Sequence, residues 1–140
     1  EVCESYYTTP IGKAKLVMEG HDLSIITYGM GVHWAKSAVE KLNVNADILD
    51  LRTLLPLDEE AIFNSVKKTN KVLILHEDCL TGGIGGELAA LINEHCFEYL
   101  DAPVMRCASM DTPVPFAVEL ENQFLPLEEL DEKINQLVNY

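Results

Sequence analysis

Short apolar runs alternate with segments of helical periodicity along most of this chain, and that alternation constrains the fold more than any other feature. Four runs rich in β-branched and aliphatic residues are predicted to be strands, at residues 23–28, 46–56, 71–75 and 102–109. Apolar residues at helical spacing predict helices after each of them, at residues 34–42, 58–66, 86–99 and 126–140. Strands joined by helices of this length pair in parallel through right-handed crossovers, so the pattern predicts an α/β fold with helices on both faces of the sheet.

Local signals mark where these elements begin and end. Pro56 ends the second run, and Asp58 is predicted to cap the helix that follows it. Glu59 and Glu60 then fall in the first turn, where the helix dipole favours acids. A further short extended run, Lys15 to Met18, precedes the first strand, and the alternation alone does not place it in the sheet.

The length of 140 residues predicts a tail at residues 1–9 and a single domain at residues 10–140. No apolar run reaches the roughly 20 residues that span a bilayer, and the beginning of the chain lacks the plan of a signal peptide. We therefore expect a soluble, cytoplasmic protein. Scattered cysteines in a chain with a full-sized core predict reduced thiols at Cys3, Cys79, Cys96 and Cys107.

The chain is strongly acidic, with 23 acidic against 10 basic side chains and a formal net charge of −13. Nucleic acids and anionic membranes require patches of Lys and Arg, so the balance argues against both as partners. A basic protein partner is the natural complement of such a surface. The alternative is that the acidity only keeps the protein in solution.

The stretch "HEDCLTGGIGGE", residues 76–87, follows a predicted strand, at the edge of an α/β sheet where ligands usually bind. Its glycines do not spell a known phosphate cradle. A dinucleotide fingerprint would need a glycine at Leu88, and a P-loop would need lysine at Glu87. No Lys or Arg occurs between Lys71 and Arg106, so a bound polyphosphate would meet repulsion from the many acids of this segment.

The same stretch also contains side chains that can bind a metal ion or act as a nucleophile. Its possible ligands, together with those of the next helix, are His76, Glu77, Asp78, Cys79, His95 and Cys96. The zincin spacing fails at Leu80, and the His and Cys residues are not arranged as two close ligand pairs. A nucleophilic pair of Cys79 and His76 is disfavoured, because surrounding carboxylates raise the pKa of a thiol. We predict no metal site and no catalytic residue here, only a small buried thiol and an ordinary histidine.

The glycines at this position then need a structural reason. We expect a sharp strand-to-helix turn that requires positive φ, together with a close approach of the backbone by something large, such as another subunit. The residues concerned are Gly82, Gly83, Gly85 and Gly86.

The order of "DLSIITYGMGV", "DILDLRTLLPLDEEAI", "KVLILHED…TGGIGGELAALI", "FEYLDAPVMR" and "DTPVPFAVELENQFLP" resembles one family specifically. It is the C-terminal domain of the β subunit of thiamine-diphosphate-dependent 2-oxoacid dehydrogenases, of the pyruvate and branched-chain type. The resemblance runs from about Pro10 to Pro126. The chain is similar, more loosely, to the C-terminal domains of transketolase and of deoxyxylulose-phosphate synthase.

The resemblance implies a three-layer α/β/α fold with a five-stranded mixed sheet, in which one strand is antiparallel to the others. The run from Lys15 to Met18 fits that strand. It also implies that the parent oxidoreductase binds thiamine diphosphate and magnesium between domains that precede this region. This chain has no G-D-G motif followed by a magnesium-binding Asn, so the domain alone is expected to bind no cofactor and to be inactive.

Partner contacts are also implied by the resemblance. In bacterial relatives, the subunit-binding domain of the dihydrolipoyl acyltransferase presents basic side chains to an acid in an "L-(D/E)-A-P" turn and to the terminal carboxylate. The matching positions are Asp101 and Tyr140. Six acids near the end of the chain face one base, Lys133, and complement such a partner, although they could merely solvate a terminal helix. They are Glu119, Glu121, Glu128, Glu129, Asp131 and Glu132.

Assembly into a multienzyme complex, with the other dehydrogenase subunits and as a homodimer, follows from the same resemblance. The "TPVPF" segment, residues 112–116, is expected to fix a loop at a subunit interface. A rival function is an autonomous flavodoxin-like module that binds a small ligand at the strand ends. Another is the C-terminal domain of a related thiamine enzyme such as transketolase, which the "DLRTLLPLD" and "LDAPV" stretches disfavour.

Overall fold

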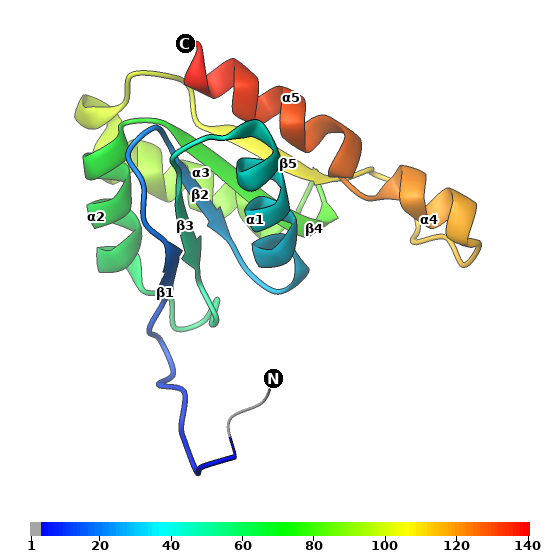
Figure 1. Cartoon of the computed structure of the whole chain (residues 1–140), viewed down its shortest axis with the longest axis horizontal. Coiled ribbons are helices and arrows are strands. Elements are labelled where there is room, and N and C mark those ends of the chain that lie inside the picture. The colour runs from blue at the N-terminus through cyan, green and yellow to red at the C-terminus, as the bar shows by residue number, and fades with distance from the viewer. Residues whose placement is uncertain (1–3) are drawn as a thin grey trace.

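A five-stranded sheet forms the centre of the protein in a computed structural model that describes residues 4–140. The strands are β1 (Lys15–Met18), β2 (Ser24–Thr27), β3 (Asp47–Asp50), β4 (Val72–Cys79) and β5 (Met105–Ser109). The helices are α1 (Met30–Leu42), α2 (Glu59–Thr69), α3 (Ile84–Cys96), α4 (Val118–Phe124) and α5 (Leu127–Val138), with a short 3-10 helix at Phe97–Tyr99. Figure 1 shows the helices around the sheet.

The strand order is β1-β3-β2-β4-β5, and the last four of these strands run parallel to one another. β1 pairs with β3 in the antiparallel direction. The predicted mixed sheet with one antiparallel strand is therefore confirmed, and the run that the alternation could not place is the edge strand.

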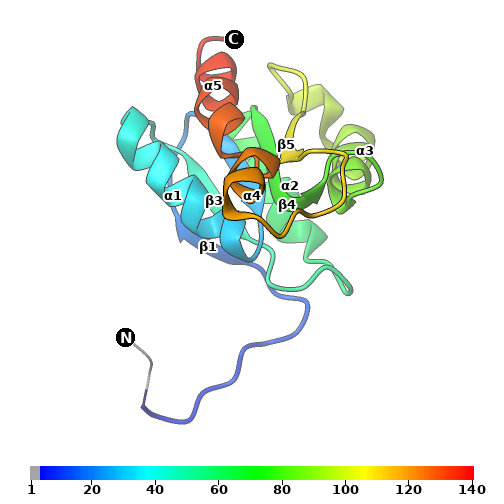
Figure 2. The same cartoon turned by 90° about the vertical axis from the view of Figure 1, so that its right-hand side faces the viewer.

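Two helical layers cover the two faces of the sheet (Figure 2). Alternate strand residues point to opposite faces, so β2, β3 and β4 each contribute to both cores. Ile25, Ile48 and Leu75 pack with α1 and α5 on one face. Ile26 and Ile74 pack with α2 and α3 on the other. Burial on both faces explains why these strands read as continuous apolar runs.

Several element bounds differ from the predicted ones. β3 stops at Asp50 and not near residue 56, because Arg52 takes a left-handed conformation with φ 58°. The Asp50 side chain accepts a hydrogen bond from the Arg52 N–H at 3.0 Å, which stabilises this turn. β4 runs four residues beyond Leu75, to Cys79. α3 begins at Ile84 and ends at Cys96, where the 3-10 helix takes over.

A short helix, α4, forms where no helix is predicted. Its seven residues are too few to show a helical repeat, and the proline-rich segment before it suggests only a loop. The Ala117 carbonyl accepts hydrogen bonds from the Leu120 and Glu121 N–H groups at 3.0 and 2.8 Å and so begins the helix.

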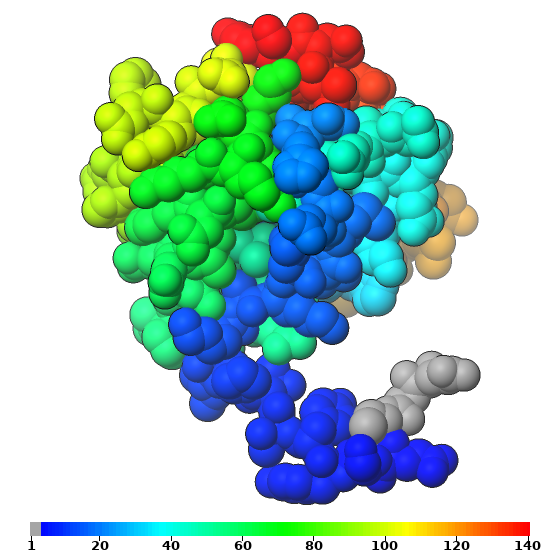
Figure 3. Space-filling model, turned by 60° about the vertical axis from the view of Figure 1, so that its left-hand side comes forward, coloured from blue at the N-terminus to red at the C-terminus, as the bar shows by residue number. Residues whose placement is uncertain are grey.

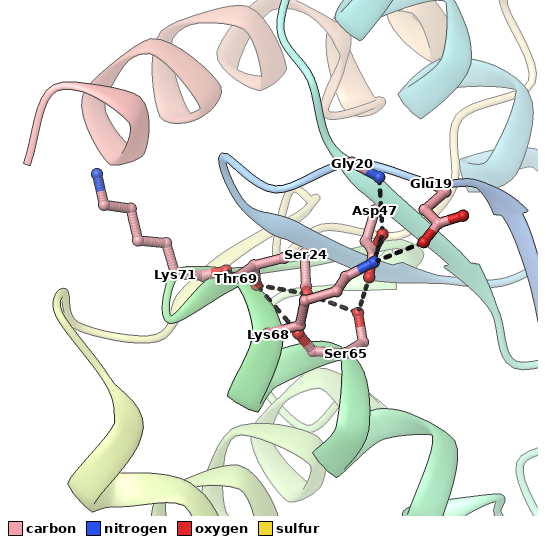
Figure 4. A network of polar contacts seen from close by, with 8 residues as sticks. All are labelled: Glu19, Gly20, Ser24, Asp47, Ser65, Lys68, Thr69 and Lys71. Atoms are coloured by element: carbon pink, nitrogen blue, oxygen red, sulfur yellow. Dashed lines mark hydrogen bonds and ion pairs between the residues drawn. The ribbon is translucent and has the colours of Figure 1, made fainter.

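A buried polar network fixes α2 to the amino ends of β2 and β3 (Figure 4). The Asp47 side chain is 1% exposed and accepts hydrogen bonds from Gly20 N–H at 2.8 Å and Ser65 Oγ at 2.9 Å. Lys68 Nζ donates to the same carboxylate at 2.6 Å. Ser24 Oγ shares a hydrogen bond with Ser65 Oγ at 2.6 Å. Every oxygen of the buried carboxylate is therefore satisfied, as a buried charge requires.

Asp58 caps α2 as predicted, accepting from the Ala61 N–H. The carboxylate also accepts from the Ala14 N–H at 3.0 Å and lies 3.6 Å from Lys13 Nζ. Burial would raise the pKa of Asp58, but the two backbone hydrogen bonds and Lys13 outweigh it and hold that pKa below its ordinary value. The cap thus also secures the segment that leads into β1.

Residues 4–10 extend away from the domain (Figure 3). The chain joins the fold at Gly12, whose N–H donates to Thr53 Oγ1 at 2.9 Å. Within residues 4–140, no helix combines the length and the apolar character needed to cross a membrane.

Candidate partner-binding site

The glycine turn follows β4 at the carboxyl edge of the sheet. Gly82 has φ +80°, so the predicted need for positive φ holds at this glycine. A Cβ at Gly83 would lie 2.3 Å from the Cys79 carbonyl oxygen, and one at Gly85 would lie 2.4 Å from His76 Nε2. Within this chain, the group that the backbone approaches is thus His76, and the approach of another subunit stays a prediction. Gly86 has no such neighbour within 3.4 Å of the added Cβ.

His76 is fully buried beneath this turn. Both ring nitrogens lack a hydrogen-bond partner within residues 4–140, so the ring is not paired with the Cys79 thiol. Burial lowers the pKa of His76, and Asp78 only partly offsets that effect. Cys79 is half-buried and not buried as expected, and its Sγ lies 3.7 Å from the Thr112 carbonyl oxygen. His76 is therefore held as a neutral ring that supports the turn.

Side chains from β5 and the segment after it tie the turn in place. Thr81 donates to the Asp111 carboxylate through its N–H at 2.8 Å and its hydroxyl at 2.6 Å, and these hydrogen bonds hold the pKa of Asp111 below its ordinary value. Arg106 Nη1 donates to the Leu80 carbonyl at 3.1 Å. The Arg106 guanidinium thus lies beside the turn, although no Lys or Arg is near the turn in the sequence. Its hydrogen bond to the Leu80 carbonyl gives it a structural role there.

A cavity of about 360 Å³ opens at the same edge, in the place where an α/β sheet usually binds a ligand. Its lining consists of Tyr28, Glu77, Asp78, Val114, Glu121, Phe124 and Leu125. These residues include three acids and no base, so the cavity does not fit a diphosphate. Burial, together with Asp78 and Glu77, raises the pKa of Tyr28. Within residues 4–140, no group of three or more His, Cys, Asp or Glu side chains is placed to hold a metal ion.

Large apolar side chains are exposed around this edge, on the segments that follow β2, β3 and β5. We call them the apolar edge: Met30, Leu55, Met110, Val114, Phe116, Val118 and Leu120. Phe116 is 104% exposed and Leu55 is 94% exposed, so neither side chain packs against its own domain. Several large apolar side chains exposed at one edge of a sheet are typical of a surface that binds another protein.

A second hollow, of about 610 Å³, lies at the opposite, amino edge of the sheet, and we call it the amino-edge groove. It is lined by Asn93, Phe97, Glu98, Leu100, Asp101, Ala102, Pro103 and Tyr140. The structure thus brings together both residues that the sequence singles out as partner contacts. Asp101 is exposed and follows the 3-10 helix, and Tyr140 is 65% exposed just beyond α5.

The side chain of Asp101 is available for a partner. Within residues 4–140, no hydrogen bond or ion pair engages the Asp101 carboxylate, whereas its N–H donates to the Asn70 carbonyl at 2.9 Å. Phe97, which is 74% exposed, and Glu98 add an aromatic face and a second acid. The sequence pattern hides these two residues inside a predicted helix. The groove can therefore receive a basic side chain together with an apolar stem.

The acids near the end of the chain do not line this groove. They lie on α4 and the first half of α5, whereas Tyr140 follows the other end of α5, about 12–18 Å along the helix axis from the acids of α5. Asp131 is paired with Lys41, and Glu129 lies 2.9 Å from Lys133. The prediction that these acids take part in docking therefore concerns long-range attraction of a basic partner, and not contacts inside this groove.

Comparisons with known proteins give a consistent result. The profile of the family described as "Transketolase, C-terminal domain" matches residues 12–129. The β subunit of 2-oxoisovalerate dehydrogenase from Bacillus subtilis is 46% identical over 129 residues, covering 89% of this chain and 39% of that protein. The mitochondrial β subunit of the pyruvate dehydrogenase E1 component from Dictyostelium discoideum is 44% identical, covering 83% and 33%. The chain spans about two fifths or less of these curated relatives.

Two further matches are a curated oxidoreductase subunit and a solved structure. The β subunit of the acetoin:2,6-dichlorophenolindophenol oxidoreductase of Bacillus subtilis is 43% identical over 129 residues, covering 90% of this chain and 38% of that protein. A solved structure described as a split gene transketolase, in an inactive beta4 tetramer, superimposes with a TM-score of 0.80. It covers 99% of this chain and 45% of that chain at 22% identity, which shows the shared fold alone.

Proposed function

The chain belongs to the transketolase C-terminal domain family, and we propose that it is the C-terminal domain of a β subunit, or of a fused α/β chain, in a 2-oxoacid dehydrogenase. The whole enzyme would use thiamine diphosphate and magnesium to decarboxylate a 2-oxoacid and acylate a lipoyl group. The relatives named as β subunits, which this chain matches over more than four fifths of its length, support this assignment. A cytoplasmic location stays a prediction, because the relatives include bacterial and mitochondrial proteins.

The domain itself is proposed to do no chemistry. The cavity at the carboxyl edge, with its three acids, does not suit a diphosphate, and His76 is buried without access to a substrate. Its work would be assembly at one edge of the sheet and docking at the other. The apolar edge supports the assembly role, since a second copy or another subunit would cover Phe116 and Leu55.

Docking of the acyltransferase is proposed for the amino-edge groove. The single observation that carries this proposal is that Asp101 and Tyr140, far apart in the sequence, line one groove, with the Asp101 carboxylate unpaired among residues 4–140. A Lys or Arg of the acyltransferase subunit-binding domain would form a charge-assisted hydrogen bond with that carboxylate. The net charge of −13 would accelerate the encounter with a basic partner.

A calorimetric titration of the protein with the subunit-binding domain of the acyltransferase from the same organism tests the docking proposal. We expect saturable binding that Asp101→Asn weakens. Glu60→Gln is the matched control, because it also removes one exposed negative charge. Glu60 lies at the start of α2, whereas Asp101 is hydrogen-bonded to Asn70 at the end of that helix. Equal weakening by the two variants would show that only net charge matters and would contradict docking at Asp101.

Titration with nucleotides and flavins tests the rival function. A flavodoxin-like module would bind one of them stoichiometrically at the carboxyl edge. We expect no heat of binding, because Glu77, Asp78 and Glu121 would repel a phosphate there. Stoichiometric binding of any of these ligands would overturn the assignment of a non-catalytic domain.

A further inference from the structure

The turn between α2 and β4 contacts both walls of the amino-edge groove. We propose that Asn70 and Lys71, the two residues of this turn, are positioning residues that set the spacing between Asp101 and the end of α5. The inference rests on the docking function proposed for this groove, and it adds which residues hold Asp101 and Tyr140 at a fixed spacing.

Asn70 holds the wall that carries Asp101. Its amide Nδ2 donates to the Tyr99 carbonyl at 2.6 Å, and its own carbonyl accepts from the Asp101 N–H at 2.9 Å. Asn70 ends α2 in a left-handed conformation with φ 62°, which points its backbone and side chain to the same segment. Lys67, one turn earlier, places Nζ 5.0 Å from the centre of the Tyr99 ring. The end of α2 thus fixes the residues on both sides of Leu100.

Lys71 holds the other wall. Its Nζ donates to the Val138 carbonyl at 3.1 Å, at the carboxyl end of α5, where a cation also interacts favourably with the helix dipole. Figure 4 shows the Lys71 side chain extended toward the end of a helix, away from the polar network around Asp47. Tyr140 lies two residues beyond this contact, and its N–H donates to the Leu137 carbonyl of the same helix at 3.3 Å.

The two walls depend on this turn for their polar connection. Within residues 4–140, no hydrogen bond joins residues 97–103 directly to residues 134–140. Figure 3 shows the tip that follows α2 in green, between the yellow-green segment after α3 and the red end of α5. The two walls also share an apolar core through Ala102 and Leu137, so Asn70 and Lys71 supply the polar part of the connection. A docking partner that contacts both walls would be sensitive to the loss of either hydrogen bond.

Four variants separate this positioning role from a simple charge effect. Asn70→Asp removes the amide donor to Tyr99, and Lys71→Met removes the donor to Val138. Asn43→Asp is the control for the first, because Asn43 also ends a helix in a left-handed conformation, with φ 53°. Lys133→Met is the control for the second, because Lys133 Nζ also donates to a backbone carbonyl, that of Arg106, at 2.8 Å.

All four changes make the protein more negative by one charge, so electrostatics alone would tighten binding of a basic partner in every case. A positioning role predicts weaker binding, and not tighter binding, for two of the four variants. We expect Asn70→Asp and Lys71→Met to weaken binding of the acyltransferase subunit-binding domain by about threefold to tenfold, the effect of losing one ordinary hydrogen bond. The two control variants should bind as tightly as the unmodified protein or more tightly.

A double variant gives a readout that a general loss of stability would not produce. If Asn70 acts through Asp101, adding Asn70→Asp to Asp101→Asn should cause little further loss of affinity. Asn70→Gly, which keeps the left-handed conformation without the amide, replaces Asn70→Asp if that variant does not fold. Unchanged or tighter binding by the Asn70 and Lys71 variants overturns the inference alone. Absence of binding by the unmodified protein overturns the docking function and the inference with it.

Discussion

His76 and the glycines above it form one packed unit. The ring occupies the space that a side chain at Gly83 or Gly85 would need, so the glycine spacing reflects the bulk of a histidine on the preceding strand. Gly82 has a separate reason, its positive φ. A motif with the appearance of a ligand loop is therefore explained within one chain, residue by residue.

Neighbouring glycines in α3 should respond oppositely to alanine. A Cβ at Gly85 would meet the His76 ring at 2.4 Å, and we expect Gly85→Ala to lower the free energy of unfolding by about 1–3 kcal/mol. At Gly86 the nearest atom is 3.7 Å away, on Arg106, so Gly86→Ala should raise it by up to about 1 kcal/mol. Urea denaturation of both variants measures these changes. Equal destabilisation would contradict the packing at His76.

His76 also predicts a pH dependence of stability. Burial lowers its pKa below the ordinary value of 6.5, so below that pH the unfolded chain binds a proton that the folded protein does not. The free energy of unfolding should therefore fall as pH drops from about 6.5. His76→Leu removes this group, and denaturation curves at several pH values should show a shallower fall. An identical fall in variant and unmodified protein would show that His76 takes up its proton normally.

At the scale of single elements, α2 is fixed at both ends. Asp58 caps its first turn and the Asp47 network holds its last turns. Asp58→Ala should lower the free energy of unfolding by about 1–2 kcal/mol, since it removes an N-cap and the contact with Ala14. Glu59→Ala, at the next position but exposed, is the control and should cost less.

The lowered pKa of Asp58 predicts how the stability difference between Asp58→Ala and the unmodified protein changes with pH. The carboxylate stabilises the fold above its unfolded pKa, and that contribution is lost as pH falls through its lower folded pKa. Thermal denaturation should therefore show Asp58→Ala and the unmodified protein converging below about pH 4, with the gap fully open above it. A gap that persists in strong acid would show that the carboxylate charge is not what stabilises the cap.

Elements with strong periodicity or caps are the ones that the sequence predicts correctly. The order of strands and helices and the Asp58 cap come from local patterns, whereas the antiparallel direction of β1 came only from the family resemblance. α4 is too short to show a period, and the early end of β3 depends on Arg52 adopting a positive φ, which no local rule requires. The Asp47 network joins residues from β2, β3 and α2, so only the tertiary fold reveals it.

The candidate site, like the fold, can be predicted only in part from the sequence. The family resemblance points to Asp101 and Tyr140, but only the fold shows that they share a groove. The sequence does not single out Phe97 and Glu98, because the helix pattern continues through them, while the backbone there tightens into a 3-10 helix. The acids near the end of the chain are close to Tyr140 in sequence, but the length of α5 separates them from it.

On the scale of the whole molecule, the two edges of the sheet differ in chemistry. The carboxyl edge exposes apolar side chains, and the amino edge carries the groove that includes Asp101. A subunit could cover the first while a basic domain binds the second, because the parallel strands keep the two surfaces at opposite ends. The fold thereby places the surface proposed for assembly and the groove proposed for docking at opposite ends of the sheet.

Self-association should depend on the apolar edge. Phe116→Asp places a charge where a subunit would cover an aromatic ring, so we expect analytical ultracentrifugation to show weaker self-association. Tyr6→Asp is the matched control, since Tyr6 is also a fully accessible aromatic residue, 93% exposed, but lies outside the apolar edge. A similar loss in both variants would argue that charge, and not this surface, controls association.

The most direct test of the division between the two edges is hydrogen exchange of the protein with and without the acyltransferase subunit-binding domain. The proposed docking predicts slower exchange at residues 97–103 and 138–140, with residues 110–120 of the apolar edge unchanged. Slower exchange confined to residues 110–120, or none at residues 97–103, would contradict it.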